Sequence, residues 1–132
     1  MTSIREVDKT RVGCWSVVAL IVAQTLSTLV AGGPAELRIV GLVFNAVAAA
    51  SVFLLFRRPD RNRWPLVAWT AGFFGWHVTG LLTLSGIATT GLDAVFTVGT
   101  GQHGLSVLYQ VVLATVAGFA VHLLLPRPKP RA

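Results

Sequence analysis

The feature that most constrains this chain is a short basic segment, residues 57–65, that separates two long apolar stretches. It reads Arg-Arg-Pro-Asp-Arg-Asn-Arg-Trp-Pro, and its four arginines would each cost roughly 2.5–3.5 kcal/mol at the centre of a bilayer. Pro59 and Pro65 each disfavour helical geometry in the residue before them. The chain must therefore break here, in water, and each flanking stretch is long enough for two membrane-spanning helices.

The composition favours a membrane protein over a soluble domain. Of the 132 residues, 54% are hydrophobic and only 12% are charged, against about 25% charged in a typical soluble domain. The net charge of +6 would suggest a nucleic-acid partner, but the basic residues lie at the ends of the apolar stretches and are not interleaved with aromatic residues. We therefore expect a multi-pass protein of the cell membrane, with the lipid bilayer as its partner and no nucleic acid.

A membrane-spanning helix needs about 20 apolar residues, and the chain holds four such stretches in one transmembrane domain, residues 1–132. The expected helices are residues 12–31, 37–56, 66–85 and 105–125. The first stretch, preceded by basic residues, could be taken for a signal peptide, but it is too long for a signal h-region and Pro34 adjoins the apparent cleavage site. We expect it to be retained as a helix.

The distribution of lysine and arginine predicts how the bundle is oriented. Three precede Val12, four lie in the basic loop 57–65 and three follow Pro126, whereas the other two connections contain only Arg38. The positive-inside rule then places both termini and the basic loop in the cytoplasm. The predicted fold class is thus an all-α, four-transmembrane-helix bundle with one longer, structured outer loop.

That outer loop, residues 86–104, is apolar and rich in glycine, which is unusual for a loop exposed to water. Two interpretations stay open. The loop either folds flat on the bundle or in the membrane interface, or it forms a re-entrant segment or lid over a cavity. The second is tolerated at membrane depth only where the backbone faces protein or water.

Four polar residues are expected at one level of the membrane. Counted from the cytoplasmic helix ends, Gln24, Asn45 and His77 lie roughly 16–18 Å deep and Thr115 about 15 Å deep, near the middle of a core about 30 Å thick. Such a midplane polar layer either fixes helix register by hydrogen bonding or forms a site for a small solute or a proton. His77 is the leading candidate, because imidazole titrates near neutral pH and ionisable groups inside membranes mark functional sites.

Four further polar residues are secondary candidates. Gln110 and His122 belong to a row at spacing four, together with small residues, that predicts the contact face of the last helix. Asp93 and His103 lie in the outer loop and could form an extracytoplasmic catalytic pair. The five acidic residues all lie at helix ends or in loops, and no nucleophile has a base at a fixed spacing, so enzymatic activity is not expected.

No cofactor or metal is predicted, because one cysteine and three scattered histidines show no ligand spacing. Haem is the alternative. By helix rise His122 lies about 13 Å from His77, too far to share one iron, so a haem would need His77 or His103 at a subunit boundary.

The leading functional hypothesis is a bundle that acts as a homo-oligomer or with other membrane subunits, and whose polar layer contacts a small solute, a proton or a partner helix, as in transport. The alternatives are a purely structural accessory subunit and a redox subunit that holds haem.

Overall fold

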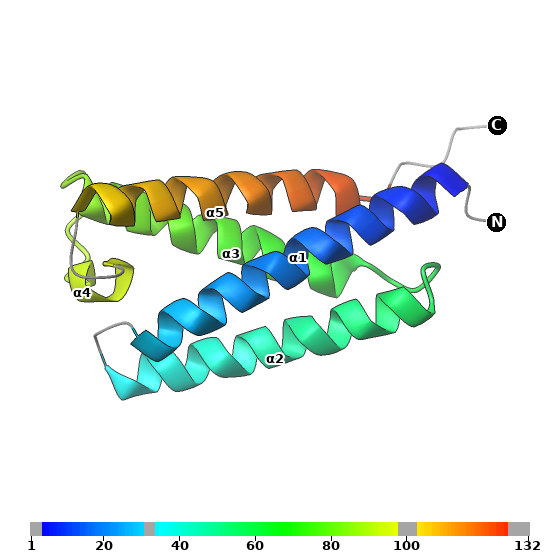
Figure 1. Ribbon diagram of the computed structural model, residues 1–132, viewed down its shortest axis with the longest axis horizontal. Coiled ribbons are helices and arrows are strands. Elements are labelled where there is room, and N and C mark those ends of the chain that lie inside the picture. The colour runs from blue at the N-terminus through cyan, green and yellow to red at the C-terminus, as the bar shows by residue number, and fades with distance from the viewer. Residues whose placement is uncertain (1–3, 31–33, 98–102, 127–132) are drawn as a thin grey trace.

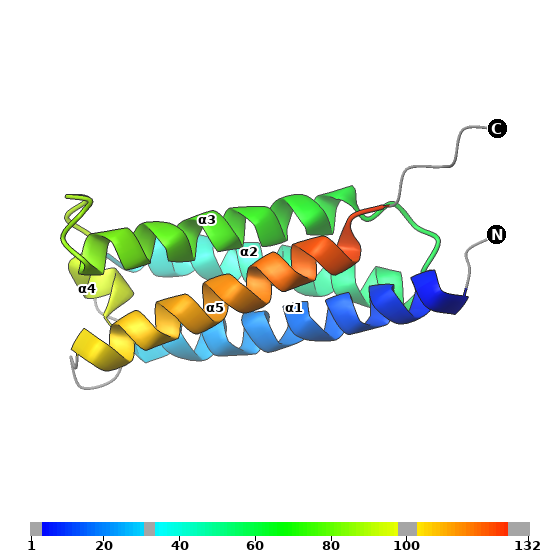
Figure 2. The same cartoon turned by 90° about the horizontal axis from the view of Figure 1, so that it is seen from above.

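The structure is a computed structural model that describes residues 4–30, 34–97 and 103–126, and it is helical throughout its regular parts. Four long helices lie antiparallel to their neighbours in the chain (Figure 1), and α4 is a single short turn at one end of the bundle. Seen from above, α3, α5 and α1 lie in that order, and α2 lies behind them (Figure 2). The elements are α1 (Ile4–Val30), α2 (Ala35–Arg57), α3 (Trp64–Leu84), α4 (Asp93–Phe96) and α5 (His103–Leu124).

Prolines and glycines mark most of the described helix ends. Pro34 precedes α2 and Pro65 occupies the first turn of α3, where its missing N–H costs nothing. Gly86, with a φ of +76°, follows the end of α3. A residue with a Cβ rarely adopts this left-handed conformation, which reverses the chain after a helix. The basic segment interrupts the helices, with residues 58–63 connecting α2 to α3.

The start of α1 differs from the prediction. The first helix was expected at residues 12–31, but α1 begins at Ile4. No proline or glycine precedes Gly13, so nothing stops the helix from extending beyond its apolar part. Thr10 is buried against the rest of the bundle. Apolar composition predicts where a membrane begins, but it does not predict where a helix begins.

Three of the four long helices are long and apolar enough to cross a membrane: Val7–Val30, Ala35–Arg57 and His103–Leu124. Only 22% to 33% of the residues in their most apolar windows are buried, and large side chains such as Leu29, Phe44 and Phe119 are more than half exposed. A surface this apolar is typical of contact with lipid. The remaining long helix, α3, is the shortest at 21 residues and is not among these three. That α3 also crosses the membrane therefore stays a prediction.

Apolar packing in the bundle forms two clusters, and α2 contributes to only one of them. The cluster near the basic segment draws on all four long helices; it consists of Cys14, Val17, Ala48, Val52, Leu55, Leu66, Val67, Ala120 and Leu124. The other cluster joins α1, α3 and α5 only, through Leu20, Phe73, Leu113 and Ala117. Residues 35–44 of α2 contain no buried residue. Helices α2 and α3 therefore meet near the basic segment and separate toward the other end.

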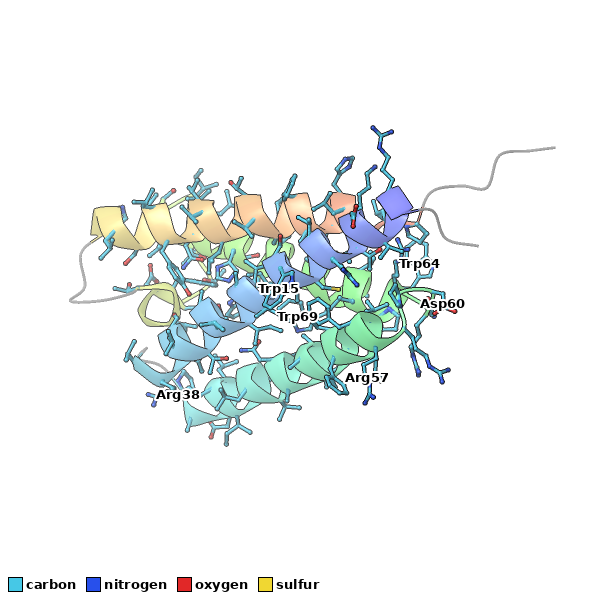
Figure 3. All side chains as sticks on the ribbon, turned by 45° about the vertical axis from the view of Figure 1, so that its right-hand side comes forward. Trp15, Arg38, Arg57, Asp60, Trp64 and Trp69 are labelled. Atoms are coloured by element: carbon cyan, nitrogen blue, oxygen red, sulfur yellow. The ribbon has the colours of Figure 1, made fainter. Side chains whose placement is uncertain are left out.

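Within the part of the chain that the structure describes, the other basic residues lie at the end of the bundle opposite Arg38. Figure 3 shows Arg57, Asp60 and Trp64 at one end and Arg38 at the other. The start of α1, the connection from α2 to α3 and the end of α5 share the first end (Figure 1). The charge asymmetry on which the topology prediction rests is thus present in three dimensions. Which end faces the cytoplasm stays a prediction.

Substitution by arginine at two exposed positions of α5 tests whether this helix lies in lipid. Val112 is 48% exposed near the middle of α5, and Leu125 is 42% exposed just beyond its end. We expect Val112→Arg to reduce membrane insertion and thermal stability by about 2.5–3.5 kcal/mol, because its charge would lie at the bilayer centre. Leu125→Arg is the matched control, since its side chain can reach the interface. Equal tolerance of both would contradict a lipid-facing α5, because exposed sites on a soluble bundle accept either change within about 0.5 kcal/mol.

Candidate functional site

The centre of the bundle holds a chain of hydrogen-bonded side chains built on His77. His77 is 1% exposed, and each of its ring nitrogens has a glutamine partner. Nδ1 contacts Oε1 of Gln110 from α5, and Nε2 lies 3.1 Å from Oε1 of Gln24 from α1. Gln110 in turn donates from Nε2 to the carbonyl oxygen of Phe96 at 3.0 Å. Three long helices and α4 are therefore linked through one imidazole.

The hydrogen-bond donors and acceptors in this network determine whether Gln24 turns its amide oxygen or its amide nitrogen away from His77. Because the Gln110 amide nitrogen donates to Phe96, its oxygen faces His77, and Nδ1 must carry the hydrogen. A neutral imidazole then has only an acceptor at Nε2, so Gln24 must donate from its amide nitrogen and turn its oxygen away. An imidazolium donates from both nitrogens and accepts the Gln24 oxygen instead. The protonation of His77 thus reverses the polarity of the exposed side of the Gln24 carboxamide.

A close approach between α3 and α4 holds Phe96, the last member of this series of hydrogen bonds, in place. Phe96 is 1% exposed and lies over Gly80, where an added Cβ would come within 2.5 Å of the Phe96 ring and 2.9 Å of Gln110 Oε1. The tilted ring of Trp76 packs against Phe96 with ring centroids 4.8 Å apart, and the hydroxyl groups of Thr83 and Thr90 are hydrogen-bonded at 2.9 Å. The described part of the outer loop therefore packs on the end of α3, while residues 98–102 lie outside the described residues.

The expected midplane layer is only partly assembled. Gln24 and His77 are brought together, and the buried Asn45 lies near them but donates to Thr25 Oγ1 at 3.1 Å rather than joining the chain. Thr115 is exposed and its hydroxyl bonds the carbonyl oxygen of Val111 in its own helix. The residue of α5 that contacts His77 is Gln110, not Thr115 as the depth estimate predicted. The spacing pattern of α5 had indicated Gln110 as a contact residue.

The remaining candidates do not gather into a site. Asp93 begins α4 and His103 begins α5, and both are exposed. His122 is exposed near the opposite end of α5. In the described parts of the chain, no three His, Cys, Asp or Glu side chains lie close enough to hold a metal ion. Since both ring nitrogens of His77 already contact glutamines, ligation of haem iron by His77 would require one of these bonds to break.

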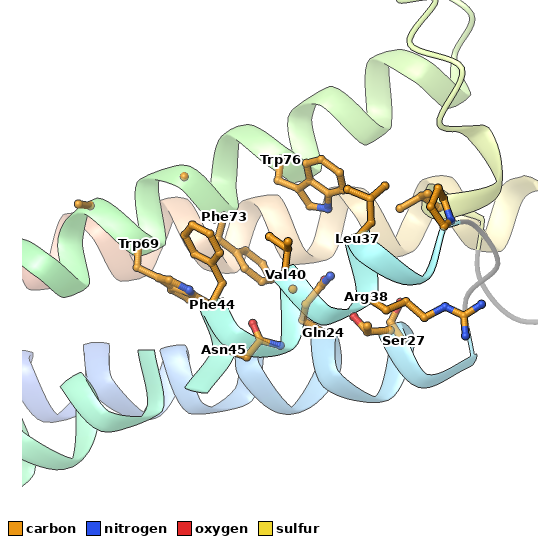
Figure 4. Close-up of a pocket in the computed structure, with 16 residues that line it drawn as sticks. Gln24, Ser27, Leu37, Arg38, Val40, Phe44, Asn45, Trp69, Phe73 and Trp76 are labelled. Carbon is orange, nitrogen blue, oxygen red and sulfur yellow. The ribbon is translucent and has the colours of Figure 1, made fainter. Parts of the chain in front are cut away.

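A groove of about 360 Å³ lies where α2 separates from α3, with α1 as its floor. Four aromatic side chains line it, with Phe44 from α2 opposite Trp69, Phe73 and Trp76 from α3. Figure 4 shows the Gln24 and Asn45 side chains at the floor and Arg38 toward one end. The volume and the mostly apolar lining with a few polar groups are those of small-molecule sites, which span roughly 300–1,000 Å³.

Sequence reasoning did not identify this groove, although part of its signal is in the sequence. Trp69, Phe73 and Trp76 recur at i, i+4 and i+7, so they lie along one face of α3. An aromatic stripe of this kind is equally typical of core packing, and Trp69 and Phe73 do pack together, with ring centroids 5.0 Å apart. What makes the stripe the wall of a groove is the separation of α2, which no local pattern reveals.

Substitution of Gly80 by alanine should disrupt the hydrogen-bonded network around His77. Substitution of Gly75 on the same helix is the matched control. A methyl group at Gly80 must displace the Phe96 ring or the Gln110 carboxamide, so we expect Gly80→Ala to destabilise the bundle by about 1–3 kcal/mol. Gly75 has no atom within 4 Å of an added Cβ, and Gly75→Ala should stabilise the helix by up to about 1 kcal/mol. Thermal unfolding in detergent measures both changes. Equal effects of the two variants would contradict the packing of Phe96 on α3.

Removing the Gln110 carboxamide tests the hydrogen-bonded chain itself. Gln110→Leu keeps the volume but leaves the His77 Nδ1 hydrogen and the Phe96 carbonyl without their partner, at about 1–3 kcal/mol for each buried group. Thr115→Val is the control, and should change stability by less than about 0.5 kcal/mol because its side chain is exposed. A destabilising Thr115→Val combined with a neutral Gln110→Leu would place Thr115, not Gln110, in the layer.

The comparisons with known proteins leave the site to be interpreted from its own geometry: no protein-family model matches the chain, and no curated protein or solved structure does. In that geometry two features meet at one residue. Gln24 ends the buried hydrogen-bonded chain, and it also lines the groove.

Proposed function

We propose that this chain is an integral membrane protein that binds a small amphiphilic molecule in the groove between α1, α2 and α3. The observation that carries the proposal is the double position of Gln24, which bonds His77 on one side and lines the groove on the other. A molecule in the groove would meet the Gln24 carboxamide, whose polarity depends on the protonation of His77. Of the three ligands expected at the polar layer, a small solute, a proton or a partner helix, this proposal selects the solute.

The lining of the groove indicates the chemistry of the ligand. Phe44, Trp69, Phe73 and Trp76 favour an apolar body. Gln24 and Asn45 provide hydrogen bonds to one or two polar atoms deep in the groove. Phe44 is 59% exposed, so the groove opens sideways between α2 and α3. A ligand dissolved in the bilayer could therefore enter without crossing water.

The proposal includes a membrane arrangement. The basic end faces the cytoplasm, as the positive-inside rule predicts, and α3 crosses the membrane with its neighbours. Its 21 residues extend about 31 Å at 1.5 Å per residue, which matches the hydrocarbon core. The exposed small residue Ala71 of α3 would let a helix of a second copy or of another membrane subunit approach closely.

A structural role is the second candidate, and one observation favours it. In the described parts of the chain, every fully buried side-chain nitrogen or oxygen already has a hydrogen-bond partner. The polar chain is thus complete without a ligand, as a device that only sets helix register would be. The two candidates differ in one respect, which is whether the groove binds a ligand saturably.

Quenching of tryptophan fluorescence tests binding in the groove. In a Trp15→Phe, Trp64→Phe background the remaining tryptophans, Trp69 and Trp76, both line the groove. A single-chain phosphocholine with a brominated acyl chain, added to the protein in maltoside micelles, should quench them saturably, because bromine quenches on contact. Gly72→Leu should abolish the saturable component, since it adds a side chain inside the groove where a Cβ meets no atom within 4 Å.

Gly75→Leu is the matched control for this experiment. Gly75 lies on the same helix with equally open space, but it does not line the groove. We expect Gly75→Leu to retain saturable quenching. Quenching that rises linearly with the probe in all variants would overturn the binding role and favour the structural one.

A further inference from the structure

Arg38 stands apart from every other basic residue of the chain. Of the eleven lysines and arginines, three precede Val12, four lie in residues 57–63 and three follow Pro126, which leaves Arg38 alone. It belongs to the first turn of α2, at the end of the bundle opposite the basic segment (Figure 3). It is exposed, and it lines the groove.

Nothing in the described parts of the chain neutralises this charge. Arg38 has no hydrogen bond or ion pair with a residue in 4–30, 34–97 or 103–126. Glu36 is two positions away, so its side chain leaves the helix in a different direction. Glu36, in the first turn of α2, offsets the partial positive charge of the helix start. The guanidinium of Arg38 is therefore the group at this end of the apolar groove with which an anion would pair.

The dimensions of the groove favour a single acyl chain over a helix. From Arg38 to Asn45 the groove follows α2 for seven residues, about 10 Å by helix rise. Beyond Asn45 it closes, because Ala48 and Val52 pack into the cluster near the basic segment. This depth lies within one leaflet, which is about 15 Å of hydrocarbon. An acyl chain fits this length, whereas a membrane-spanning helix of a second copy extends about 30 Å and would contact the groove along only about a third of its length.

We propose that the groove holds an acyl chain of an anionic membrane phospholipid whose phosphate binds Arg38. Arginine pairs with phosphate through two parallel N–H···O bonds, and its guanidinium lies toward the end of the bundle while the aromatic walls lie deeper (Figure 4). The acyl chain packs against Phe44 and Trp76, and it ends near Asn45. This inference rests on the proposed function and adds the class of ligand and the residue that selects it.

Native mass spectrometry of the full-length protein in detergent tests the selection. The probes are phosphatidylglycerol and phosphatidylcholine with identical acyl chains, added at equal concentration. Both headgroups carry the phosphate, but the choline ammonium repels Arg38 and neutralises its own phosphate, whereas phosphatidylglycerol keeps a net negative charge. We expect the wild type to prefer phosphatidylglycerol by at least about tenfold, and Arg38→Gln to lose this preference. Arg61→Gln removes an exposed arginine at the opposite end and should keep the preference.

The outcomes separate this inference from the proposed function. Equal binding of both lipids by the wild type and by Arg38→Gln, with loss of both in Gly72→Leu, would overturn the role of Arg38 and leave the groove as a binding site. Unchanged lipid binding in Gly72→Leu would overturn the groove as well. A homodimer that Gly72→Leu dissociates would show that a second copy occupies the groove, and would overturn the lipid assignment. Displacement of the lipid by inorganic phosphate would overturn the contribution of the acyl chain.

Discussion

A histidine buried in an apolar bundle needs a hydrogen-bond partner for each ring nitrogen, and the arrangement of this protein follows from that requirement. Gln24 and Gln110 supply the partners from α1 and α5, and the Phe96 carbonyl oxygen extends the chain to α4. Helices α1, α3, α4 and α5 are thereby joined into one hydrogen-bonded unit. Helix α2 lies outside it, held by the bond from Asn45 to α1 and by apolar packing near the basic segment. The groove lies on the side where this attachment is weakest.

The hydrogen-bonded chain contributes more to specificity than to stability. Hydrogen bonds between transmembrane helices average about 0.6 kcal/mol each, whereas leaving such groups unpaired costs about 1–3 kcal/mol. The chain therefore disfavours other helix registers. Its structural role is compatible with ligand binding, because the Gln24 carboxamide has two sides. One side completes the chain, and the other meets an apolar groove that has Arg38 at its end.

Counting depth along the helices brought together the right residues of α1 and α3, but on α5 it failed in both depth and rotation about the helix axis. Gln24 and His77 were expected at one level, and they do contact each other. Thr115 was expected at nearly the same level, yet it faces outward, while the long side chain of Gln110 reaches His77 from a position nearer the α4 end. The start of α1 was also misplaced, because hydropathy marks the apolar part of a helix rather than its first turn.

The sequence by itself determined that the chain is helical, that the helices are broken within residues 57–65, and that polar residues occur within its apolar stretches. These are local properties: prolines restrict the backbone, charges avoid hydrocarbon, and about 20 apolar residues form one span. Only the tertiary structure decided that Gln110 rather than Thr115 meets His77, and that α2 separates from α3 to leave a groove beside Arg38. Helix rotation and separation depend on side chains that pack from different helices, and no single segment of the sequence contains that information.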